Sequence, residues 1–164
     1  MKILKVALYK GSKSYFGKAI RFKQYYIDRL PKRFAQYSHA ELVFEDGCFY
    51  GSSMVDGGVR MKKIRNEKRH WDFIEIKITD KNYKKVRDWC ESKVGDGYNY
   101  LGIFFAQLLN THWFLGREDY FCSHYATSGL QQAKMLCGVD GVFVSPGKLA
   151  ELLKKDYNLK LAIS

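Results

Sequence analysis

The sequence predicts an α+β fold in which an antiparallel sheet packs against helices. Three observations support this. The first half of the chain contains short segments of alternating apolar and polar residues, which are typical of strands. An Asp46-Gly47 pair joins two of these segments, as in a tight hairpin. The second half has helical periodicity with start and stop residues. We expect a single domain over 1–164, a length that can bury a core.

Five segments are expected to be strands. The first is 3–9, and a basic helix over 14–27 follows it, ending before Pro31. The charged turn 65–70 separates the last two strands. The four strands after the helix are predicted at Ala40–Phe44, Phe49–Ser52, Val59–Ile64 and Phe73–Ile78.

The remaining elements are expected to be helices. Asp80 is the expected N-cap of a helix that ends at Gly95, and 97–110 and 122–136 are expected to be helical as well. Ser145 is the expected N-cap of a last helix, with Pro146 in its first turn.

The chain carries a formal net charge of +11. Such a surface attracts anions, such as nucleic acid, acidic lipid headgroups or an anionic polymer. The basic residues are spread along the chain and match no known nucleic-acid module, so we expect no sequence-specific nucleic-acid partner. The N-terminus does not resemble a signal peptide, and no apolar run reaches membrane-spanning length. These observations favour a cytoplasmic protein.

The four cysteines, Cys48, Cys90, Cys122 and Cys137, form no CxxC pair and no cluster with zinc spacing. We therefore expect reduced thiols, no metal and no cofactor. Cys122 is the candidate nucleophile, because it stands where the 122–136 helix should begin. There the helix dipole lowers a thiol pKa, and first-turn amides can bind an oxyanion. The alternative is a buried structural thiol.

A nucleophilic cysteine needs a base. His124 is two residues from Cys122 and points to a different helix face, while His70 and His112 are expected to be solvated. His39 lies on a strand whose alternation directs Ala40, Leu42 and Phe44 to the core. His39 and Glu41 then share the opposite face, where we expect the Cys122 helix to lie across a groove. Ser52, Ser53 and, less favourably, Glu41 are candidates to orient the imidazole.

Four segments together resemble the permuted branch of the NlpC-type papain-like family. They are "SHAELVFEDGCFYGSSMVDGGVR", "GYNYLGI", "YFCSHYATSGLQ" and "VSPGKLAELL". This branch includes YiiX-like bacterial proteins, phage and viral relatives and, more distantly, the lecithin retinol acyltransferase group. The resemblance extends from Lys10 to Leu153 and implies a papain-like fold with Cys122 as nucleophile and His39 as base. It places Ser52 where several relatives have Glu, and it suggests Tyr98, Tyr100 and Glu41 as substrate contacts.

The resemblance implies a thiol hydrolase, an amidase or endopeptidase that forms an acyl-enzyme on a peptide or acyl-amide substrate. A lipid acyl hydrolase or acyltransferase is a second hypothesis, favoured by the basic surface and by the apolar stretch 100–116, which could touch a membrane. A non-catalytic basic binding module is a third. If the protein is phage-encoded, we expect it in the host cytoplasm or the virion.

Overall fold

A computed structural model describes residues 1–12, 14–63, 70–100, 103, 119–157 and 161–162 of the chain. It contains one sheet in which all neighbouring strands are antiparallel, and the strand order is β4-β3-β2-β1-β5-β6. The strands are β1 (Lys2–Lys10), β2 (Tyr37–Val43), β3 (Cys48–Ser53), β4 (Gly58–Lys63), β5 (Trp71–Ile78) and β6 (Leu161–Ala162). The predicted α+β class with an antiparallel sheet is confirmed, and β6 was not expected.

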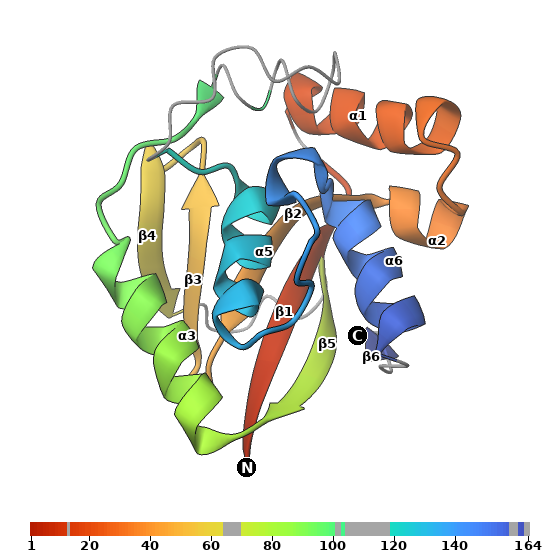
Figure 1. Ribbon diagram of the computed structural model, residues 1–164. Helices are drawn as coiled ribbons and strands as arrows, with labels where there is room; N and C mark the ends of the chain where they lie inside the picture. The colour runs from red at the N-terminus through yellow and green to blue at the C-terminus, as the bar shows by residue number, and fades with distance from the viewer. Residues whose placement is uncertain (13, 64–69, 101–102, 104–118, 158–160, 163–164) are drawn as a thin grey trace.

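The helices lie mainly on one side of the sheet. Figure 1 shows α3, α5 and α6 over one face, with α1 and α2 together at one end of the molecule. The described helices are α1 (Tyr15–Phe22), which continues into the π-helical turn η1 (Lys23–Ile27), α2 (Lys32–Ala35), α3 (Asp80–Ser92), α5 (Cys122–Gln132), the 3₁₀ turn η4 (Gly141–Phe143) and α6 (Pro146–Asp156).

The helix starts test the capping predictions. Ser145 caps α6 as expected, because its side chain accepts a hydrogen bond from the Lys148 amide. The α3 prediction is wrong by one residue. Thr79 is the cap and accepts from the Asn82 amide, while Asp80 is the first helical residue, where its charge suits the helix dipole. Most of the expected 97–110 helix and of the 65–70 turn lies outside the described residues.

The main core lies between the sheet and helices α3, α5 and α6. Ala40 and Leu42 of β2, with Phe44 just after it, point into this core, which confirms the alternation expected for the strand. Val43 lies in a smaller cluster on the opposite face, together with Trp71. Burial of one face of β2 therefore fixes its register and leaves His39 and Glu41 on the other face.

Strands β2 and β3 separate toward the end of the sheet that carries His39. Their pairing covers only Leu42 with Tyr50 and Val43 with Phe49, whereas β1 pairs with β2 along nearly its whole length. Helix α5 lies very close to β2, since a Cβ on Gly129 would meet Leu42 Cδ1 at 2.5 Å. The start of α5 reaches the place where the two strands part.

No helix within the described ranges has both the length and the apolar character needed to cross a bilayer.

Candidate active site

Cys122 is the first residue of α5, and its N-cap, Phe121, has extended backbone angles. The side chain is buried, with the residue 3% exposed. Its sulfur accepts hydrogen bonds from the backbone amides of Ala40 and Ser123. The Ala40 amide can make this contact because β2 and β3 have already separated there. The sulfur thus sits between two strands at the positive end of a helix dipole, which favours a thiolate.

His39 contacts Cys122 directly, and a hydrogen bond joins the two side chains. The predicted route to this contact needs correction. Helix α5 packs on the apolar face of β2 rather than across the His39 face, as shown by Tyr125, Ala126 and Leu130 in the main core. Only the first residue of the helix reaches the imidazole, through the opening between β2 and β3.

The second nitrogen of the His39 ring bonds to a carboxylate. His39 Nε2 lies 2.8 Å from Oε1 of Glu41, so Nδ1 is the ring nitrogen left for Cys122. Glu41 is 1% exposed, and Arg60 binds both of its oxygens at 2.6 and 2.9 Å. Arg60 also donates to Asp56 at 3.0 Å. The carboxylate is therefore buried with its charge paired, as a buried carboxylate requires.

Ser52 does not occupy the expected position beside the imidazole. Its residue is buried on β3, and its hydroxyl donates to the backbone carbonyl of Tyr120 at 2.5 Å. The residue that orients His39 is Glu41, from the same strand. Ser52 instead holds the segment just before Cys122 against β3. Ser53 lines the cavity beside the site and accepts a hydrogen bond from the Asp56 amide.

Gly51 leaves room for the Glu41 carboxylate. A Cβ at this position would meet Glu41 Cγ at 2.7 Å, closer than real Cβ contacts allow. Gly51 lies opposite Arg60 in the β3–β4 ladder, so the glycine lets Glu41 and Arg60 meet over the strand. Sequence reasoning missed both Gly51 and Arg60. A glycine inside a strand is a recognised sign of close approach, and it was the available signal.

The pKa values follow from these contacts. Burial opposes charge on the His39 ring, but the charge of the Cys122 thiolate and hydrogen bonds to Cys122 and Glu41 raise the pKa of His39 to about 10. Burial likewise opposes the thiolate, yet the charge and hydrogen bond of His39 and the two amides lower the pKa of Cys122. Hydrogen bonds from His39 and Arg60 outweigh burial and lower the pKa of Glu41 to about 2. The geometry favours a thiolate–imidazolium pair at neutral pH.

A cavity of about 500 Å³ opens beside the pair. Cys122, His39 and Glu41 lie in its wall. The apolar part of the lining includes Phe16 and Ile20 of α1, Met54 and Val55 of the β3–β4 turn, and Trp71 of β5, while Arg60, Lys62 and several serines line the rest. The cavity can therefore accept an apolar group next to the sulfur.

The two predicted substrate tyrosines have different environments. Tyr98 lines the cavity, and burial together with the nearby Cys122 thiolate raises its pKa. Tyr98 was expected on a helix, but it forms an isolated β-bridge with Tyr120 instead. Tyr100 is 52% exposed and its hydroxyl donates to the Met54 carbonyl at 3.3 Å. It is absent from the cavity lining described here.

Among the described residues, neither Cys48 nor Cys90 has a histidine partner of the kind that Cys122 has. Burial raises the pKa of Cys48, and burial raises that of Cys90 to about 12, so neither favours a thiolate. Cys137 is exposed. Within the described residues, no three His, Cys, Asp or Glu side chains gather in a way that could hold a metal ion.

The remaining histidines are separate from the pair. His70 is exposed near the start of β5, and His112 lies outside the described residues. His124 stacks against the rings of Tyr120 and Phe121. Burial lowers the pKa of His124 to about 4, which keeps the ring neutral. His124 is therefore part of the packing around the start of α5.

Comparison with protein-family models and with curated proteins finds no match for this chain.

Proposed function

We propose that the protein is a cysteine-nucleophile hydrolase of the permuted NlpC-type papain-like class, acting on an amide or peptide bond. The observation that carries this proposal is the hydrogen-bonded series Cys122, His39 and Glu41. It places a thiol at a helix N-terminus, an imidazole in contact with it and a buried carboxylate behind the imidazole. These are the parts that nucleophilic thiol catalysis requires. The histidine strand also precedes the cysteine helix, the order found in the permuted branch.

In the proposed mechanism, the Cys122 thiolate attacks the acyl carbon and forms a carbon–sulfur bond. Backbone amides at the start of α5 stabilise the oxyanion. His39 Nδ1–H gives its proton to the leaving amine as the amide bond breaks, which leaves a thioester on Cys122. His39 then takes a proton from water, the hydroxyl attacks the thioester, and the acid product leaves as the thiolate is regenerated. Glu41 holds the ring and stabilises its charged form.

A second candidate reaction is acyl transfer or hydrolysis on a lipid. The observation that favours it is the apolar wall of the cavity, where Phe16, Ile20 and Trp71 could receive an acyl chain. The apolar stretch 100–116, which was expected to touch a membrane, lies almost entirely outside the described residues. Both reactions use the same thioester chemistry and differ in the group that leaves. A thiolate nucleophile and three further unpaired cysteines favour a reducing compartment, for which we propose the cytoplasm.

Alkylation with iodoacetamide tests the catalytic pair. We expect Cys122 to react faster than exposed Cys137 below neutral pH, despite its burial, because its contact with His39 lowers the pKa of the thiol. His39→Ala should remove this advantage while leaving Cys137 unchanged, so Cys137 serves as an internal control. Mass spectrometry of tryptic peptides gives the rate at each cysteine. If Cys122 reacts more slowly than Cys137 and His39→Ala makes no difference, the protein is a binding module with a structural thiol.

A further inference from the structure

The segment α1–η1 exposes a cluster of apolar and aromatic side chains. Phe22 and Tyr26 are 59% and 63% exposed, and Tyr25 and Ile27 are 46% and 63% exposed. The ring centroids of Phe22 and Tyr26 lie 4.5 Å apart, and those of Tyr25 and Tyr26 lie 4.8 Å apart. A contiguous exposed patch of this kind marks an interaction surface. Single exposed apolar residues would need no such explanation.

Cations surround this cluster. Residues 15–36 contain six Lys or Arg and one acidic residue, Asp28. Asp28 is paired with Lys23 at 2.8 Å. Within the described part of the chain, Lys18, Arg21 and Lys32 form no ion pair, so their charges are left uncompensated. The patch therefore combines exposed rings with a local positive charge.

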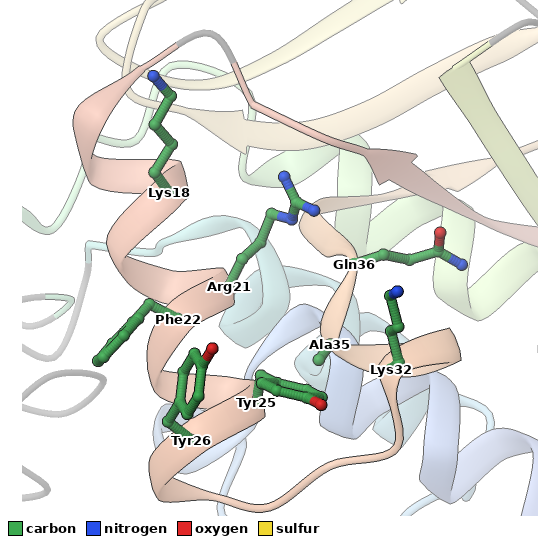
Figure 2. A pocket seen from close by; sticks show the side chains of 8 residues that line it. All are labelled: Lys18, Arg21, Phe22, Tyr25, Tyr26, Lys32, Ala35 and Gln36. Atoms are coloured by element: carbon green, nitrogen blue, oxygen red, sulfur yellow. The ribbon is translucent and has the colours of Figure 1, made fainter.

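The cations and rings border a second cavity, of about 390 Å³. Figure 2 shows Lys18 and Arg21 on α1, with Tyr25 of η1 pointing toward α2, which contributes Lys32 and Ala35. Phe22 points away from α2. No acidic residue contributes to the described lining. This opening suits an anionic headgroup, and the outward-pointing rings suit the boundary between headgroups and acyl chains.

We propose that α1 and η1 form a docking surface for an anionic lipid bilayer. Aromatic rings prefer the interfacial region of a membrane, and lysine and arginine beside them attract acidic headgroups. Exposed Ile27 adds an aliphatic side chain that a nucleic acid would not recognise, and the rings pack against one another, tilted or edge to face, rather than standing apart for bases. The charge and the apolar character together favour a lipid surface over a nucleic acid.

The docking surface is next to the proposed active site. Helix α1 contributes Phe16, Gly17 and Ile20 to the cavity beside Cys122, and it contributes Lys18, Arg21 and Phe22 to the docking surface, so one helix takes part in both. A chain docked through α1 would hold its apolar cavity close to the bilayer. Docking itself does not depend on the proposed function, and the Cys122→Ala chain should bind vesicles as well as the natural one does.

Vesicle sedimentation of the full chain tests the surface, using phosphatidylcholine vesicles with and without phosphatidylserine. We expect binding only when phosphatidylserine is present, and weaker binding at higher salt. The pairs Phe22→Ser with Tyr26→Ser, and Lys18→Glu with Lys32→Glu, should each weaken binding about tenfold or more. The matched control is Lys81→Glu with Lys85→Glu, two exposed lysines on α3, and it should bind nearly as well as the natural chain.

Equal losses in the α1 variants and the α3 control would overturn the proposal, because they would mean that net charge alone drives binding. Absence of binding to acidic vesicles would also overturn it. Tighter binding to single-stranded DNA than to vesicles, lost in the same α1 variants, would assign the surface to nucleic acid instead. If Cys122→Ala binds normally while every chain lacks thiol reactivity, docking stands and the proposed catalysis fails.

Discussion

Among single residues, Glu41 is the one on which the site depends most. Its carboxylate forms hydrogen bonds with the His39 ring and with the Arg60 guanidinium, and the residue is almost fully buried. The alternation of β2 predicted that Glu41 would share a face with His39. The alternation did not predict the contact itself, because that depends on Arg60 arriving from β4 and on the space above Gly51.

Glu41→Gln and Ser52→Ala separate the two residues considered for orienting the imidazole. Glutamine keeps a hydrogen-bonding group but removes the charge that stabilises the imidazolium, so the Cys122 thiolate should form at higher pH. We expect alkylation of Cys122 near pH 6 to slow by about tenfold, a change of one pKa unit. Ser52→Ala removes only the contact with Tyr120 and should cost about 1 kcal/mol of stability without moving the pH profile. The reverse pattern would return the orienting role to Ser52.

Among the elements, the π-helical turn η1 is held by one buried glutamine. Gln24 is fully buried, and its amide nitrogen donates to the carbonyls of Ala35 and Tyr37 at 3.3 and 2.8 Å. Its oxygen accepts from the Gly147 amide at 2.7 Å. One side chain thus ties η1 to the start of β2 and the start of α6. Periodicity predicted a helix over 14–27, but it predicted neither the π-turn nor the partners of Gln24, which lie far along the chain.

Gln24→Ala should lower the free energy of unfolding by about 1–3 kcal/mol, because it leaves several buried backbone groups without partners. Urea unfolding measures the change. Gln36→Ala is a matched control, since that side chain donates to the nearby Arg33 carbonyl at an exposed position and should change stability by about 0.5 kcal/mol or less. Equal effects for the two variants would contradict the role given to Gln24.

For the whole molecule, the α+β class and most of the strands could be predicted from the sequence, whereas the geometry around Cys122 could not. Ala40, Leu42 and Phe44 identify the core face of β2 through local alternation, which needs no knowledge of distant residues. Strands β2 and β3 separate where the 120–122 segment lies between them. Tyr120 of this segment is 68 residues further along the chain than Ser52 of β3, so local alternation cannot predict the separation. The expectation of α5 lying over the His39 face was wrong for this reason, although its first residue was placed correctly at a helix start.

Acid should destabilise the fold in two steps. Neutral His124 has a lowered pKa of about 4 against an ordinary 6.5, so the unfolded chain binds its proton first and stability falls as pH drops from 6.5 to 4. Glu41, with a pKa of about 2 against 4.5, stabilises the fold above pH 4.5 and loses this contribution as pH falls toward 2. Each step is on the order of 3 kcal/mol. Urea unfolding across pH measures both steps.

Two variants assign these steps. His124→Phe keeps a ring and removes the proton-binding group, so the upper step should disappear. Glu41→Gln should reduce the lower step while leaving the upper one. The part of the lower step that remains is assigned to Asp56, because hydrogen bonds from Lys62 and Arg60 lower the pKa of Asp56 to about 2. An unfolding free energy that stays constant between pH 6.5 and 2 would contradict both assignments.

The short pairing between β2 and β3 divides the sheet end into two ribbons that are joined at Leu42–Val43. One ribbon, β3 with β4, holds the segment before Cys122 through Ser52 and Tyr120. The other, β2 with β1 and β5, carries His39 and the Ala40 amide. Cys122 and His39 are therefore held by different ribbons, which are joined only through the Leu42–Tyr50 and Val43–Phe49 pairs in the described residues. The position of the Cys122 sulfur relative to the His39 ring is thus set by how far the two ribbons diverge beyond the Leu42–Val43 pairing.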